Sequence, residues 1–163
     1  MSDTSSTLAH LCNDQSCHQT TSSAALKGHL ECLKWVYTTR GEWHPETTFS
    51  AAYEGHLSCL KYAHENGCPW DPHTTYFAAD KGHVECLRYA HENGCPWNPA
   101  VIHIAAKNGR LECLKYIYKN CELVDWNDET LKFVEPEIRE FIMSAKNGQK
   151  SSKKSHTHNM NVK

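Results

Sequence analysis

Cysteine and histidine are the residues of this sequence whose types and spacing could support metal or redox chemistry. The 163 residues include 9 cysteines and 12 histidines. Thiolate and imidazole are ligands that zinc prefers, so a metal-binding or redox-sensing protein is one hypothesis. Four cysteines form a column at intervals of 27 residues: Cys32, Cys59, Cys86 and Cys113. A separate cluster has the spacing C-x4-C-H, with His10 as the nearest further ligand: Cys12, Cys17 and His18.

The regular interval of the cysteine column also supports a structural interpretation. Helices pack roughly 10 Å apart, so two members of the column cannot share a zinc ion through Zn–S bonds of about 2.3 Å. A free cysteine packs as a small apolar side chain. We therefore predict that the column lies in a core, together with Cys68 and Cys95, and we expect no metal and no cofactor there. For Cys12, Cys17 and His18 the metal alternative stays open, although their spacing is not that of a standard zinc finger.

Two histidines near the ends of equivalent segments form another column. His64 and His91 align with His10 at multiples of 27 residues. Tyr37 occupies the equivalent position between His10 and His64. Such a column could form a pH-sensitive or metal site. Because the histidines recur with the repeat, we expect them to be structural.

The interval of 27 residues organises most of the chain. Residues 71–97 and 44–70 are identical at 18 of 27 positions. A fixed period in this range predicts stacked supersecondary units. The sequence divides into four repeats: 17–43, 44–70, 71–97 and 98–124, which together span 17–124.

Each repeat predicts two short helices joined by a turn. Paired alanines such as Ala78 and Ala79 permit close packing of the first helix. Asp71-Pro72 and Asn98-Pro99 match an N-cap followed by proline at the first helical position. A glycine before the second helix predicts the turn, and a tryptophan at the end of a repeat is expected to fill the gap to the next one. The glycines are Gly28, Gly55, Gly82 and Gly109, and the tryptophans are Trp43, Trp70 and Trp97.

The predicted fold is therefore all-α, a solenoid of stacked helix pairs with degenerate capping helices at its ends. Residues 1–16 are predicted to form a polar N-terminus and a partial capping repeat. Residues 125–143 are predicted to form C-terminal capping helices, over 128–134 and 136–143. Residues 144–163 carry five lysines and no acid, and their polar composition predicts a disordered basic tail.

The repeat resembles the ankyrin repeat. The resemblance rests on Ala51-Ala52, on Gly55-His56-Leu57 and on the exit Gly67-Cys68-Pro69-Trp70, in register across 17–124. The period differs, since ankyrin repeats have about 33 residues. The six missing residues fall between Gly94 and Ala105, where ankyrin repeats build a projecting finger. The resemblance implies a non-enzymatic scaffold or adaptor that binds a protein partner on its concave first-helix face.

Candidate partner-binding residues are those that differ between repeats at equivalent solvent-facing positions. Most come directly before the turn glycines, where the ankyrin family places variable contact residues, and the others lie in the first helix. The candidates are Tyr53, Glu54, Tyr76, Asp80, Lys81, His103, Lys107 and Asn108.

Composition and motifs limit the other function classes. The formal net charge is −2, which gives no overall electrostatic case for nucleic acid or a membrane surface. No apolar run is long enough to span a membrane, and no secretory signal is visible. Phosphate loops, HExxH helices and nucleophile elbows are also absent from the sequence. We expect an intracellular monomer, cytoplasmic or nuclear, with a protein partner and no small-molecule substrate. A remnant of a longer array with little activity is a further alternative.

Overall fold

The computed structural model of the chain describes residues 19–120 and 136–144. They belong to two compact bodies, Met1–Val124 and Asp125–Lys163. The described residues of the first body form eight helices and no strand. These are α2 (Thr21–Leu26), α3 (Leu30–Arg40), α4 (Thr47–Tyr53), α5 (Leu57–Glu65), α6 (Thr74–Lys81), α7 (Val84–Glu92), α8 (Val101–Lys107) and α9 (Leu111–Asn120).

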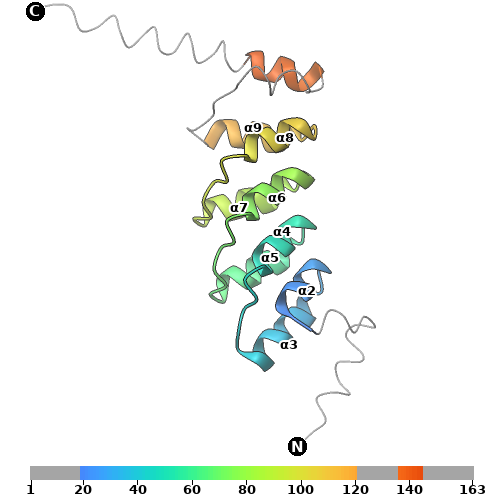
Figure 1. Ribbon diagram of the computed structural model, residues 1–163, viewed down its shortest axis with the longest axis vertical. Coiled ribbons are helices and arrows are strands. Elements are labelled where there is room, and N and C mark those ends of the chain that lie inside the picture. Colours follow the sequence, from blue (N-terminus) through green and yellow to red (C-terminus); the bar gives the residue numbers. More distant parts are fainter. Residues whose placement is uncertain (1–18, 121–135, 145–163) are drawn as a thin grey trace, which may run out of the picture. The chain divides into compact units, whose positions relative to one another are not determined.

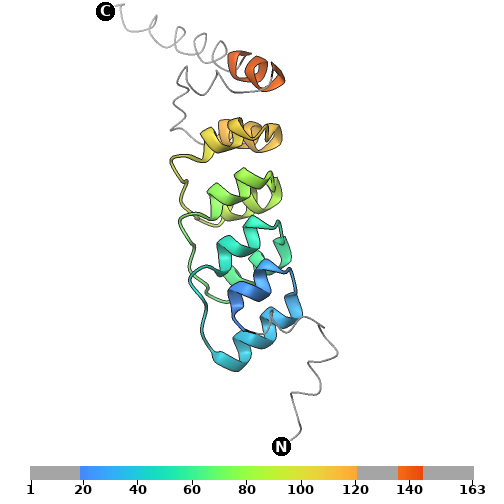
Figure 2. The same cartoon turned by 45° about the vertical axis from the view of Figure 1, so that its right-hand side comes forward.

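The eight helices form two layers. The first helices of the repeats, α2, α4, α6 and α8, pack one against the next, and so do the second helices, α3, α5, α7 and α9. Figures 1 and 2 show the resulting stack of helix pairs. The all-α solenoid expected from the sequence is confirmed.

The core consists of columns that recur through the repeats. The alanine pair of each first helix is 0% exposed, as is one leucine of each second helix. The cysteines before these leucines are buried as well, as predicted. Alanine allows the first helices to approach closely, and leucine and cysteine fill the space between the layers. The columns are Ala24/Ala51/Ala78/Ala105, Ala25/Ala52/Ala79/Ala106, Cys32/Cys59/Cys86/Cys113 and Leu33/Leu60/Leu87/Leu114.

Glycine is required at the turn between the two helices for two reasons. Gly55 has φ of +78°, a left-handed conformation that side chains disfavour. A Cβ atom on Gly55 would also lie 2.5 Å from Nδ1 of His83 in the next repeat. Gly28 has the same relation to His56. The histidine ring of the next repeat therefore packs directly against the turn glycine, and the absence of a side chain on that glycine leaves room for it.

The tryptophans join successive repeats, as the sequence predicted. Nε1 of Trp70 donates to the carbonyl oxygen of Asn93 in the next repeat, at 2.9 Å. The ring of Trp70 also stacks on His64, with 4.5 Å between the ring centroids. In the first repeat, Trp43 stacks instead on Tyr37, at 4.0 Å.

Buried threonines form a second link between repeats, which the sequence did not predict. The hydroxyl of Thr48 accepts a hydrogen bond from the backbone N–H of Asp71 at 3.0 Å and bonds to the Thr74 hydroxyl at 3.2 Å. Two other threonines make the equivalent bond with a residue 23 positions ahead. These pairs are Thr21 with His44, at 2.9 Å, and Thr75 with Asn98, at 3.1 Å. We call these bonds the threonine links.

The predicted caps at Asp71-Pro72 and Asn98-Pro99 were wrong. Helix α6 begins at Thr74, after His73. The carboxylate of Asp71 accepts the N–H of His73 at 2.7 Å, and the Thr74 N–H bonds to the carbonyl of Asp71. The Asp-Pro pair therefore builds a tight turn that precedes the helix, because an Asp side chain readily bonds to the N–H two residues on.

In the second body the described residues form one helix over 136–144. Two isoleucines of this helix, Ile138 and Ile142, are buried, at 3% and 0% exposure. The other predicted closing helix, over 128–134, lies outside the described residues, as do the partial repeat at 1–16 and the tail at 145–163. The domain boundaries stay predictions.

Candidate partner-binding face

The candidate residues lie along the first helices, mostly at their C-terminal ends. Tyr53 is the last residue of α4, and Glu54 follows it as the C-cap. Asp80 and Lys81 end α6. Lys107 and Asn108 end α8, while Tyr76 and His103 lie one turn further back. We call the solvent-facing side of α2, α4, α6 and α8 the first-helix face.

Tyr53 and Lys81 are brought together although they belong to different repeats. The ammonium of Lys81 lies over the Tyr53 ring, 4.4 Å from its centroid, and 3.9 Å from the carboxylate of Asp80. A hydrogen bond with Tyr53 is the main cause that raises the pKa of Lys81, and the charges of Asp80 and Glu54 raise it further. Lys81 is therefore a cation in contact with the Tyr53 ring and the Asp80 carboxylate, with the charge of Glu54 nearby.

Asp80 connects the third repeat to the fourth. Its carboxylate accepts a hydrogen bond from the Asn108 amide at 2.5 Å, and its backbone carbonyl accepts one from Nε of Arg110 at 3.0 Å. Sequence analysis did not identify Arg110 as a contact residue. The other repeats have a histidine at this position, and this difference could have pointed to Arg110. Asp80 and Asn108 thus have a structural contact in addition to any role toward a partner.

Phe77 is the centre of an aromatic cluster on the first-helix face. Its ring centroid lies 5.2 Å from Phe49, 5.4 Å from Tyr53 and 5.2 Å from Tyr76. All four side chains are half-buried. We call these residues the aromatic cluster. Sequence analysis did not choose Phe77; the signal was that serine occupies the equivalent position 50, whereas position 77 carries a large ring.

The fourth repeat extends the face with different chemistry. His103 is half-buried on α8, and Lys107 is exposed at its end. The structure therefore brings Tyr53, Glu54, Tyr76, Asp80, Lys81 and Asn108 into one neighbourhood, and it places His103 and Lys107 beside it on the next helix.

The core cysteines are poorly suited to nucleophilic or redox chemistry. Burial raises the pKa of Cys86 to about 12 and that of Cys59 and Cys113 to about 11. The thiol is thus the dominant form near neutral pH, and the thiolate is the reactive species. Cys68 and Cys95 are also buried, and their pKa values rise to about 11 for the same reason.

The histidine column takes part in aromatic and hydrogen-bond contacts between repeats. Nδ1 of His64 lies 3.1 Å from the Tyr89 hydroxyl, and Nδ1 of His91 lies 2.9 Å from the Tyr116 hydroxyl. Among the residues that the structure describes, no group of three His, Cys, Asp or Glu side chains could hold a metal ion. The cluster of Cys12, Cys17 and His18 lies outside those residues, as does His10.

The described part of the chain contains no helix with the length and apolar character needed to cross a membrane.

Helix pairs stacked in two layers, with the same contacts repeated at each junction, define an α-solenoid repeat protein. A profile of ankyrin repeats in three copies matches residues 48–130, more than half of the chain. The chain belongs to the ankyrin repeat family. Such repeats are protein-interaction modules, and a protein partner is accordingly the kind of partner that the family indicates.

Solved structures show the same fold. The crystal structure of the human ASB11 ankyrin repeat domain has a TM-score of 0.63 and 20% sequence identity to this chain. The similarity covers 77% of this chain and 67% of that one. No curated protein matches the chain.

Proposed function

We propose that the chain is a non-enzymatic adaptor that binds a protein partner through its first-helix face, the side expected to be concave. The observation that carries this proposal is the aromatic cluster around Phe77. Half-buried rings surrounded by charged groups are typical of the centre of a protein interface, where a few aromatic side chains supply most of the binding energy. Here the rings come from two repeats, and Glu54 and Lys81 lie at their edge.

The proposal includes an intracellular monomer without a small-molecule substrate. The raised pKa values of the buried thiols disfavour redox chemistry at the core cysteines, and this supports an adaptor over a redox sensor. A metal-binding function of the Cys12 cluster is a separate hypothesis, which elemental analysis of protein purified without added metal would test.

The proposal predicts that Phe77→Ser weakens partner binding by about tenfold or more, as expected for loss of a central aromatic side chain. Serine is the chain's own residue at the equivalent position 50, so the helix is expected to tolerate it. Affinity capture from the native host, with quantitative mass spectrometry, would identify proteins that the wild type retains and this variant loses. The dissociation constant of each would then be measured with purified components.

A charge exchange on the second-helix layer is the matched control. Glu112 and Lys115 form an exposed ion pair on α9, with 2.7 Å between Oε1 and Nζ. The double variant Glu112→Lys/Lys115→Glu keeps the pair and the net charge, and should bind like the wild type. Equal capture by the Phe77→Ser protein, or selective loss in the control, would contradict the assignment of the first-helix face.

A further inference from the structure

Two asparagines at the junctions between repeats are each followed by glycine. The pairs are Asn66-Gly67 and Asn93-Gly94, at equivalent positions of the second and third repeats, and both asparagines are exposed. In such a pair the backbone nitrogen of glycine can attack the asparagine side chain, because glycine has no Cβ to hinder the close approach. The reaction is spontaneous deamidation, for which water is the only co-reactant.

Deamidation proceeds through a ring. The glycine nitrogen forms a bond to Cγ of asparagine and loses its proton to water, while the bond from Cγ to Nδ2 breaks and ammonia leaves with a proton from water. A water molecule then opens the ring. Its addition at Cγ gives aspartate, and its addition at the backbone carbonyl carbon gives isoaspartate, in which the chain runs through Cβ and Cγ.

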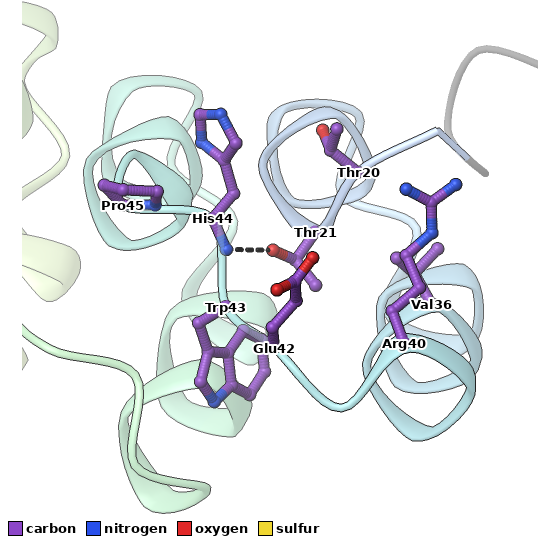
Figure 3. Close-up of a pocket in the computed structure, with 8 residues that line it drawn as sticks. All are labelled: Thr20, Thr21, Val36, Arg40, Glu42, Trp43, His44 and Pro45. Atoms are coloured by element: carbon purple, nitrogen blue, oxygen red, sulfur yellow. Dashed lines mark hydrogen bonds between the residues drawn. The ribbon is translucent and has the colours of Figure 1, made fainter.

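The backbone carbonyl of Asn66 belongs to the junction between the first and second repeats. It accepts a hydrogen bond from Nε1 of Trp43 at 3.0 Å and another from the Tyr37 hydroxyl at 3.2 Å. Figure 3 shows Trp43 at this junction, together with the threonine link from the His44 N–H to the Thr21 hydroxyl as a dashed line. The Asn66 carbonyl is thus one of the groups that join the two repeats.

Asn93 has the same role at the next junction. Its backbone carbonyl accepts the hydrogen bond from Nε1 of Trp70, at 2.9 Å. In isoaspartate this carbonyl becomes part of a carboxylate outside the backbone, and the chain gains one carbon atom. The tryptophan would then lose its acceptor, and the end of α7 would be distorted.

The folded chain engages the two reacting groups in other hydrogen bonds. The side-chain amide of Asn93 donates to the carbonyl of Tyr89 at 2.8 Å, and the N–H of Gly94 bonds to the carbonyl of His91 at 3.1 Å. Asn66 and its glycine make the same two bonds one repeat earlier, at 2.8 and 3.0 Å. Attack on Cγ requires the glycine N–H to give up its proton and the side chain to turn, so both bonds must break first. Deamidation therefore needs local opening of the helix end.

We propose that Asn66 and Asn93 are deamidation sites that the folded junctions protect, and that conversion to isoaspartate at either site unlinks the two repeats that its carbonyl joins. The reaction needs an open junction, and its product hinders closure, so each conversion is an irreversible record of opening. This inference is independent of the first-helix face and does not rest on the function proposed for it.

Asn120 is an internal control for the chemistry. Its side chain donates to the carbonyl of Tyr116 at 2.8 Å, as the side chains of the other two asparagines do one and two repeats earlier, but Cys121 follows it instead of glycine. Two further Asn-Gly pairs are followed in the same measurement: Asn108-Gly109 and Asn147-Gly148.

The test is peptide mapping by mass spectrometry of the full chain after incubation at mildly alkaline pH, with isoaspartate quantified at each asparagine. One sample is incubated folded and a second one in concentrated urea. We expect the rates at Asn66 and Asn93 to be at least about tenfold lower in the folded sample, because only molecules with an open junction react. Asn120 should convert far more slowly than these two in urea, because the Cys121 side chain hinders the attack.

Two tryptophan variants form a matched pair. Trp70→Phe removes the donor to the Asn93 carbonyl and keeps an aromatic ring, and Trp43→Phe does the same for Asn66. In the folded chain, Trp70→Phe should raise the rate at Asn93 at least about threefold and leave the rate at Asn66 unchanged, because only one junction is loosened. Trp43→Phe should have the opposite pattern.

Hydrogen exchange examines the product. The fraction with isoaspartate at residue 93 carries one more negative charge and is separated by ion exchange. In this fraction the N–H of Asp71, which bonds to Thr48 at the same junction, should exchange at least about tenfold faster than in the unmodified chain. The N–H of His44, at the preceding junction, should exchange at the unmodified rate.

Equal rates in the folded and the urea samples would overturn the proposal, as would equal acceleration at both asparagines in Trp70→Phe, since the whole chain would then open. Unchanged exchange at Asp71 in the converted fraction would overturn the unlinking of the repeats. Should the variants fail to fold, the two wild-type samples and the exchange of the converted fraction still decide the question.

Discussion

At the scale of single residues, the buried thiols have an energetic consequence. Cys86 has a pKa of about 12 in the folded chain, because burial disfavours the thiolate, against an ordinary value of 9.0. Between these two pH values the unfolded chain loses the proton that the folded chain keeps. The thiol therefore contributes its full stability below pH 9, and this contribution is lost as the pH rises through the folded pKa.

We expect the free energy of unfolding to decrease between pH 9 and 10.5, and to decrease less in Cys86→Ala. The difference between the two slopes should approach about 1.4 kcal/mol per pH unit, the limit for one thiol. Urea unfolding followed by circular dichroism at several pH values measures both slopes. Parallel lines for the two proteins would show that Cys86 does not titrate on unfolding.

A second prediction at this scale concerns Gly55. Gly55→Ala should destabilise the chain more than Gly94→Ala, although both glycines have positive φ. A left-handed non-glycine residue costs roughly 1–2 kcal/mol, and the Cβ atom on residue 55 would in addition meet the His83 ring, whereas one on residue 94 has nothing within 4 Å. Urea unfolding of both variants gives the comparison.

The additional cost at residue 55 should disappear when the ring is removed. In the background His83→Ala, Gly55→Ala should cost about as much as Gly94→Ala does in the wild type. If the cost of Gly55→Ala were the same with and without the ring, the conformation alone would explain the glycine.

At the scale of elements, the threonine links show how neighbouring repeats are joined by polar contacts inside an apolar core. Thr48 is 0% exposed, and its hydroxyl accepts the Asp71 N–H while donating to the carbonyl of Pro69 at 3.4 Å. A buried N–H that loses its partner is costly. The fourth repeat has Ile102 at the corresponding position, so the series of hydroxyls ends there.

Thr48→Val should therefore reduce the free energy of unfolding by about 1–3 kcal/mol, the range for an unsatisfied buried donor. Valine has nearly the same shape, so packing is largely preserved. Thr38→Val, at an exposed position of α3, is the control and should change stability by less than about 0.5 kcal/mol. Similar urea midpoints for the two variants would mean that the hydroxyl of Thr48 is not needed.

At the scale of the whole molecule, the period determines how much could be predicted from the sequence. The period predicts the number of helix pairs, the alanine and cysteine columns and the tryptophan junctions. These residues recur at equivalent positions, and their side chains pack in the same way in each repeat. Features that occur once were not predictable in this way. Phe77 was overlooked because the helix period alone does not tell a half-buried ring from a core side chain. The ending of α3 at Gly41, whose N–H bonds to the carbonyl of Tyr37, is a further feature that occurs in the first repeat and was not predicted.

The candidate face was predictable as a set of positions but not as a set of contacts. Variation between repeats identified Tyr53 and Lys81, yet the pairing of that ring with that ammonium depends on the stacking distance between α4 and α6. Asp80 was chosen as a partner contact, and the structure adds its bonds to Asn108 and Arg110. Contacts between repeats depend on how the helices pack in three dimensions. Sequence differences between the repeats do not show which residues make those contacts.

The junction between the second and third repeats has one further consequence, which concerns the gene. Its contacts pair the glycine with a histidine, the threonine with a backbone N–H, and the tryptophan with an asparagine carbonyl, and each pair is offset by a fixed number of residues. Duplication of any window of 27 codons within this region would therefore create a new repeat with both of its junctions complete. Unequal recombination would accordingly lengthen or shorten the chain in whole repeats that keep these junction contacts.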